Sequence, residues 1–172
     1  MKKVILIGYM GSGKSVISAQ LAQKMGFVFV ELDDCIEKKS GTSIANLFQT
    51  KGELYFRKLE REIFLKLVND PRQLIISTGG GTPCYYNNHK LLQVEGVVSV
   101  YLMASVTTLV SRLSKEKHAR PLIANLDSND LNEFIAKHLF DRSFYYNQAT
   151  FKVSVDAKSE NEITSEIVDL LV

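Results

Sequence analysis

Short apolar runs alternate with segments of helical spacing along this chain. The runs, rich in Val, Ile and Phe, span 4–7, 27–32, 74–77, 97–103 and 151–155. Continuous runs of this kind are typical of strands buried on both faces of a parallel sheet. The alternation therefore predicts an α/β fold in which a five-stranded sheet lies between two layers of helices. Because no Pro- or Ser-rich linker interrupts it, we expect a single domain over residues 1–172.

Sequence signals at the ends of several segments support the predicted helices. In 14–25 apolar residues recur at four-residue intervals, and Gly26 is placed to end that helix. A longer helix is predicted over about 53–69. The last helix opens on the capping box formed by Ser159 and Glu162.

Two stretches are longer than a simple strand–helix alternation requires. Residues 33–70 contain three helix-like pieces where one crossover helix would be enough, and residues 114–128 are polar and loop-like. Long excursions in a compact domain serve as binding surfaces or lids, or else are ordinary surface insertions.

Composition excludes several classes of function. The net charge of +2 is too small to predict a nucleic-acid partner. No run approaches the ~18 apolar residues of a membrane span, so we expect no membrane partner. Cys35 and Cys84, without an export signal, predict reduced thiols in the cytoplasm. The size and self-contained fold favour a monomer.

The first apolar run leads into the motif that carries most information. Residues 8–15 read GYMGSGKS and satisfy G-x-x-x-x-G-K-[ST] in a strand–loop–helix setting. Such a loop turns backbone N–H groups toward phosphate oxygens, its lysine reaches the β- and γ-phosphates, and its serine can hold Mg²⁺. The residues predicted to bind the nucleotide here are Gly11, Ser12, Gly13, Lys14, Ser15 and Val16.

Carboxylates lie at the end of the second apolar run, at the sheet edge where α/β folds bind ligands. Asp33 could accept a proton from an attacking hydroxyl. Glu31, two residues earlier and so on the same strand face, could orient a Mg²⁺-bound water. Alternatively Asp33 or Asp34 caps the next helix, and Asp34 is the better candidate for that role.

Arginine is scarce, with six residues against fifteen lysines. Its planar guanidinium can grip a carboxylate or a phosphate at two points. Arg57, Arg112, Arg120 and Arg142 lie beside motifs or in the long polar stretch, although a lone helical arginine is more often a solvated surface residue. The triple glycine 79–81 either lets a ligand approach the backbone or forms a flexible turn.

Together these residues resemble the shikimate kinase family, within the nucleoside monophosphate kinase-like group of P-loop proteins. The matching pieces are G-x-x-G-x-G-K-S at 8–15, Asp33-x-x-Ile36-Glu37, Gly41-x-Ser43-Ile44, Phe56-Arg57-x-x-Glu60, Gly79–Gly81, Arg120-Pro121-Leu122 and Arg142-x-x-x-Tyr146. The resemblance implies the strand order 2-3-1-4-5. It also implies a shikimate-binding region at about 33–61 and a lid at about 114–126.

By the same resemblance, the γ-phosphate of ATP passes to the 3-hydroxyl of shikimate with Mg²⁺ as cofactor, a step toward chorismate and the aromatic amino acids. The implied catalytic residues are Asp33, Lys14 and Arg120, the last closing over the phosphates. The implied substrate-binding residues are Asp33, Arg57, Gly79, Gly80, Gly81 and Arg142, with the two arginines on the shikimate carboxylate. Arg112 is implied to lie against adenine, and Ser15 and, through water, Glu31 to serve the metal.

Two positions depart from the family pattern. Glu31 stands where the family commonly has Asp, which leaves the Mg²⁺ geometry open, and Phe144 stands where a proline is usual. The residue of the adenine pocket near Lys158 and Ser159 is also open. Two other functions remain as alternatives: a gluconate-kinase-like or other small-metabolite kinase of the same fold, and a catalytically silent nucleotide-binding regulatory module.

Overall fold

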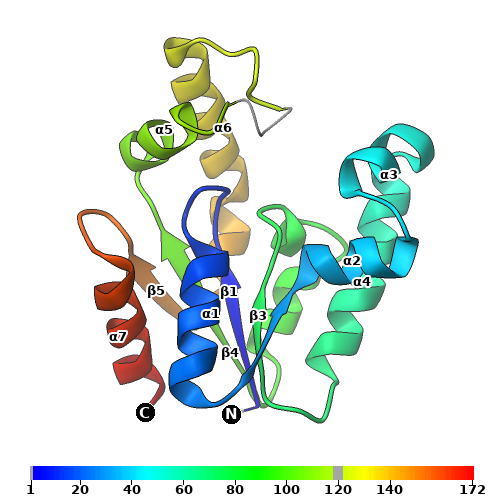
Figure 1. Cartoon of the computed structure of the whole chain (residues 1–172), viewed down its shortest axis with the longest axis vertical. Helices are drawn as coiled ribbons and strands as arrows, with labels where there is room; N and C mark the ends of the chain where they lie inside the picture. Colours follow the sequence, from blue (N-terminus) through cyan, green and yellow to red (C-terminus); the bar gives the residue numbers. More distant parts are fainter. Residues whose placement is uncertain (1, 118–121) are drawn as a thin grey trace.

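Five parallel strands in the order β2-β3-β1-β4-β5 form the middle layer of the protein (Figure 1). This is a computed structural model, and it describes residues 2–117 and 122–172. The strands are β1 Lys3–Ile7, β2 Val28–Glu31, β3 Leu74–Ser77, β4 Val97–Met103 and β5 Phe151–Ser154. Every pairing is parallel. The predicted three-layer fold and strand order are therefore confirmed.

Helices cover both faces of this sheet. They are α1 Lys14–Met25, α2 Leu32–Ser40, α3 Ile44–Lys51, α4 Glu53–Val68, α5 Val106–Ser114, α6 Ser128–Tyr146 and α7 Glu160–Leu171, with 3₁₀ turns η1 Thr82–Cys84 and η2 Asn88–Gln93. Helices α1 and α7 pack side by side in front of the sheet in Figure 1, whereas η2 lies behind it against β4. None of the helices in the described ranges is long and apolar enough to span a membrane.

The predicted helix ends are largely confirmed. Gly26 ends α1 with φ +69°, and its N–H donates to the carbonyl of Ala22. Ser159 and Glu162 form the predicted capping box at the start of α7. The three helical pieces of 33–70 are α2, α3 and α4, which make up one side of the molecule (Figure 1).

The junction after β2 differs from the prediction. The strand ends at Glu31 and α2 begins at Leu32, so Glu31 is the N-cap residue and its side chain makes no capping hydrogen bond. The prediction that Asp34 caps this helix was wrong, because Asp34 already lies in the first turn. Strand and helix abut, and no intervening residue is available to serve as a separate cap.

The sheet core is apolar along β1, where the Val4–Ile7 side chains are completely buried. Lys3 is buried with them, and its ammonium donates to the carbonyls of Asp70 and Arg72 at 2.6 and 2.8 Å. The segment expected to be a lid follows α5, which ends at Ser114. Residues 118–121, including Arg120, lie outside the described residues.

Candidate active site

The carboxyl ends of β1, β2 and β3 face a cavity of about 710 Å³. In a parallel sheet these ends meet at one edge, so loops distant in sequence converge there. The walls of the cavity include residues 10–17, Glu31, Asp33, 78–80, Arg112, Lys115, Glu116, 158–160 and Ile163. All six residues predicted to bind the nucleotide from the first loop are thus in one cavity wall.

The loop between β1 and α1 is shaped by its glycines. At Gly8, with φ +150°, an added Cβ would lie 2.8 Å from the Leu102 carbonyl oxygen, so no other residue fits. The Lys14 ammonium donates to the carbonyls of Gly8 and Tyr9 at 2.8 and 3.0 Å. Buried Ser12 Oγ has no hydrogen-bond partner among the described residues. The loop therefore holds a cation and a free hydroxyl at the cavity.

Asp33 and Glu31 both line this cavity, although not for the predicted reason. The two side chains do not share a strand face, because Glu31 ends β2 and Asp33 lies within α2. Ser77 Oγ donates to Glu31 Oε1 at 2.7 Å from the adjacent strand. Burial raises the pKa of Asp33 to about 6, helped by the negative charges of Glu60 and Glu31 and opposed by Lys14.

The triple glycine brings the two predicted substrate arginines together from different helices. A Cβ on Gly80 would lie 3.2 Å from Arg142 Nη1, and a Cβ on Gly81 would lie 2.6 Å from Arg57 Nη2. A Cβ on Gly79 would likewise lie 3.3 Å from Asp33 Oδ1. Three consecutive glycines thus leave room for three charged side chains of the predicted site.

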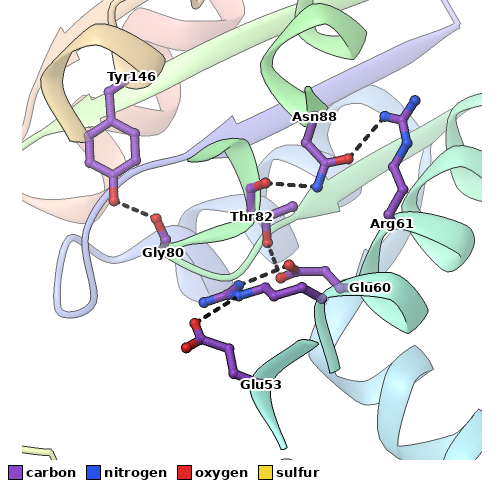
Figure 2. A network of polar contacts seen from close by, with 8 residues as sticks. Glu53, Glu60, Arg61, Gly80, Thr82, Asn88 and Tyr146 are labelled. Atoms are coloured by element: carbon purple, nitrogen blue, oxygen red, sulfur yellow. Dashed lines mark hydrogen bonds and ion pairs between the residues drawn. The ribbon is translucent and has the colours of Figure 1, made fainter. Parts of the chain in front are cut away.

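Two acidic residues on α4, Glu53 and Glu60 (both labelled in Figure 2), hold the Arg57 guanidinium in place. Glu60 accepts from Arg57 Nη1 at 2.9 Å, and the Glu53 carboxylate lies 3.5 Å from Arg57 Nε. The rings of Tyr85 and Phe56 flank the guanidinium carbon at 4.0 and 5.0 Å. Arg57 also lines a second cavity of about 350 Å³ with Cys84 and the Tyr85–Tyr86 pair.

The glycine loop is anchored at its middle residue and at the residue that follows it (Figure 2). Tyr146 donates from its hydroxyl to the Gly80 carbonyl at 2.6 Å. Beyond the glycines, Thr82 Oγ1 donates to Glu60 Oε1 at 2.7 Å. The Thr82 carbonyl accepts from Asn88 Nδ2 at 2.8 Å, and Asn88 Oδ1 accepts from Arg61 at 3.0 Å. These bonds fix the backbone against which both arginines lie.

Other predicted residues occupy the nucleotide side of the cavity. Arg112 lines it and donates from Nη1 to the carbonyl of Gly11 at 3.0 Å. Lys158 and Ser159 also lie in its wall, so this segment faces the cavity. Which of its residues contacts adenine stays open. Arg120, as noted, is outside the described residues.

Glu60, Thr82 and Asn88 were not predicted as site residues, although Glu60 is part of a matched motif. The i, i+3 spacing of Arg57 and Glu60 was the one available signal of their ion pair. Thr82 and Asn88 carry no comparable signal, because their partners lie on other elements.

Comparisons with known proteins agree with this geometry. The shikimate kinase family model matches residues 10–172. Shikimate kinases of Flavobacterium johnsoniae and Flavobacterium psychrophilum are 54% and 46% identical to the chain, each alignment covering 99% of both sequences.

Solved structures show the same likeness. A crystal structure of shikimate kinase from Bacteroides thetaiotaomicron matches with TM-score 0.90 at 30% identity, over 98% of this chain and 97% of that one. The Acinetobacter baumannii enzyme in complex with shikimate matches with TM-score 0.88 at 26% identity, over 99% and 93%. With its fold, its phosphate loop and its full-length relatives in agreement, this chain belongs to the shikimate kinase family.

Proposed function

We propose that this protein transfers the γ-phosphate of ATP to the 3-hydroxyl of shikimate, giving shikimate 3-phosphate and ADP. One observation carries the proposal beyond family membership. The phosphate loop and Asp33 share one cavity, and the adjoining glycine loop places Arg57 and Arg142 beside it. A donor site thus adjoins a site for a small hydroxy acid.

The donor side suits a polyphosphate. The buried, unpartnered Ser12 Oγ is a polar group that a phosphate oxygen would satisfy. Lys14 is held at the loop by two carbonyls and can reach the β- and γ-phosphates from there. We assign Gly11, Gly13, Ser15 and Val16 to the same nucleotide site, and Arg112 to the adenine end.

The acceptor side suits a carboxylate. Arg57 Nε is buried and makes no hydrogen bond among the described residues, and it lies 3.5 Å from the carboxylate of the half-exposed Glu53, an ion pair that a ligand carboxylate could replace. Arg142 lies beside Gly80, the neighbour of the glycine that Arg57 faces, and supplies a second cation. We assign both arginines to the shikimate carboxylate, because two guanidinium groups can bind and orient a planar anion. Gly79, Gly80 and Gly81 would allow close approach of the ring.

Asp33 is assigned to the reacting hydroxyl. With a pKa of about 6, its carboxyl is ionised at neutral pH and can accept a hydrogen bond or a proton from that hydroxyl. Phosphoryl transfer depends chiefly on alignment and charge neutralisation, so an orienting role is sufficient. Arg120, by the family resemblance, would add positive charge at the phosphates.

The oxygen donors at this site fit Mg²⁺. Ser15 and Glu31 both line the cavity, and Glu31 is oriented by Ser77. Among the described residues there is no cluster of three or more His, Cys, Asp or Glu side chains that could hold a metal. Mg²⁺ needs only a few protein ligands, because water and substrate phosphates supply most of its coordination. When bound, the ion neutralises phosphate charge, and Ser15 with Glu31 would hold it directly and through water.

We also propose a monomeric, single-domain, cytoplasmic enzyme. The walls of the cavity are drawn from residue 10 to residue 163 of one chain, so the site needs no second copy. Size-exclusion chromatography with light scattering tests this, and a dimer that persists at micromolar concentration would contradict it.

A coupled assay of ADP release, with shikimate, gluconate and nucleoside monophosphates as acceptors, tests the reaction itself. We expect turnover with shikimate alone. Turnover with gluconate instead would favour another small-metabolite kinase. ATP binding without turnover of any acceptor would favour the silent regulatory module.

A further inference from the structure

Three side chains spaced four residues apart on α6 point at the site. They are His138, Arg142 and Tyr146. Tyr146 holds the glycine loop through the Gly80 carbonyl. At the other end of this row, His138 Nδ1 lies 3.0 Å from Tyr9 Oη, which belongs to the phosphate loop. Arg142 therefore sits one helical turn from each of two attachments, one to each loop.

Tyr9 also contacts Arg142 directly. The guanidinium carbon lies 5.3 Å from the centroid of the Tyr9 ring. The ring is 1% exposed, which places a cation over an aromatic face away from bulk water. Such contacts are stronger when desolvated, because the negative ring face then competes less with water.

The hydrogen bond between Tyr9 and His138 joins two uncharged groups. Burial raises the pKa of Tyr9 to about 12, so its phenol remains protonated. Burial and the nearby Arg142 cation lower the pKa of His138, which favours the neutral imidazole. The bond therefore joins a phenol to a neutral imidazole, and the tautomer of the ring sets which of the two groups donates. The Phe134 ring packs on the imidazole at 4.2 Å and helps to hold it.

We propose that Tyr9 is a positioning residue for Arg142, so that a side chain of the ATP-binding loop sets the carboxylate clamp for the acceptor. The inference rests on the proposed role of Arg142 in binding shikimate. Tyr9 supplies the ring face under the guanidinium, and its hydroxyl fixes that ring to α6 through His138. The competing view is that Tyr9 only fills the core.

The two views differ in which substrate is affected. If the ring orients Arg142, Tyr9→Leu raises KM for shikimate roughly 3- to 30-fold, the range for loss of a cation–π contact. KM for ATP should change less than about twofold, because Lys14 binds the Tyr9 backbone carbonyl rather than its side chain. Tyr9→Phe keeps the ring and should restore most of the affinity for shikimate.

The experiment measures kcat and KM for both substrates, with thermal stability, in Tyr9→Leu, Tyr9→Phe, Arg142→Ala and the double variant Tyr9→Leu/Arg142→Ala. Phe64→Leu is the matched control, since Phe64 is equally buried but lies on α4. It should lower stability while leaving KM for shikimate unchanged. In the Arg142→Ala background, Tyr9→Leu should add no further loss in kcat/KM for shikimate.

Three outcomes would overturn the proposal: equal effects on the two substrates, no rescue by Phe, or losses that add fully in the double variant. Failure of the proposed function looks different. In that case Arg142→Ala itself would leave KM for shikimate unchanged, or the parent enzyme would not use shikimate.

Discussion

Arg57 and Glu60 form a 2.9 Å ion pair one turn apart on α4, and the Glu60 carboxylate is almost completely buried. Its second oxygen accepts from Thr82, immediately after the triple glycine. A single carboxylate therefore joins Arg57, which we propose binds the substrate, to the glycine loop that Arg57 faces. Because the Glu60 carboxylate is buried and cannot turn toward solvent, it holds the Arg57 guanidinium in one orientation.

Removal of the Glu60 charge should cost both stability and shikimate affinity. Glu60→Gln retains the shape but leaves Arg57, whose side chain is 11% exposed, without its buried counter-ion. We expect a loss of about 3 kcal/mol in the free energy of unfolding, measured in urea. KM for shikimate should rise more than KM for ATP. The control is Glu53→Gln, because Glu53 is half-exposed and 3.5 Å away, and should cost under about 1 kcal/mol. Equal losses in the two variants would contradict the prediction.

The fold was predictable because its signals are local and repeated. Strands buried on both faces read as continuous apolar runs, and Gly26 and Ser159 mark helix ends by their own backbone chemistry. The N-terminus of α2 was not predictable in this way. Asp34 has the side chain of a cap, but β2 passes directly into α2 at Glu31. Side-chain preference therefore failed where the chain had no residue between two elements.

For the site, the charged residues that lie beside sequence motifs were predicted. Asp33, Arg57 and Arg142 were all singled out, and the structure gathers them at the triple glycine. The groups that hold them were not. Tyr9 and His138 are 129 residues apart, and nothing in the local sequence of either indicates the other. Their contact depends on where the fold places α6 beside the loop that follows β1, which is a property of the whole fold.

A methyl group at Gly81 should displace the Arg57 guanidinium. The added Cβ would lie 2.6 Å from Nη2, closer than any van der Waals contact allows. The guanidinium is the far end of a flexible side chain, so it can move at small cost to the fold. We expect Gly81→Ala to raise KM for shikimate roughly tenfold, about 1.4 kcal/mol, with an unchanged KM for ATP. A proportional rise in both KM values would point to a general distortion instead.

The metal assignment can be tested at Glu31. Glu31→Gln keeps the side-chain length but removes the charge, whereas Glu31→Asp keeps the charge that the family commonly carries at this position. We expect Gln to raise the Mg²⁺ concentration for half-maximal activity by about tenfold, and Asp to raise it much less. Rates are measured against free Mg²⁺ at constant ATP. If Gln and the parent enzyme require the same concentration, Glu31 does not serve the metal.

Activity should depend on pH through Asp33. The kcat/KM for shikimate should fall as pH is lowered through about 6, because the Asp33 carboxyl, which we propose orients or deprotonates the substrate hydroxyl, becomes protonated. The negative charge of Glu60 contributes to the raised pKa of Asp33. Glu60→Gln should therefore shift the acid limb to lower pH, even though its activity is lower throughout. A parent enzyme with a flat profile between pH 5 and 7 would exclude this role for Asp33.

The same raised pKa makes Asp33 a cost to the fold. The pKa of its carboxyl is about 6 in the native protein against an ordinary value of 3.8, so the native state binds this proton more tightly. The stabilisation of the native state by this proton is therefore complete below pH 3.8 and is lost as pH rises through 6. We expect Asp33→Asn to lower kcat strongly yet raise the free energy of unfolding at pH 7 by about 3 kcal/mol. In urea titrations at pH 5 the gain should fall to about half.

Asp34→Asn is the matched control: that side chain is exposed and should give no gain. Near-normal turnover in Asp33→Asn would refute its assignment to the reacting hydroxyl.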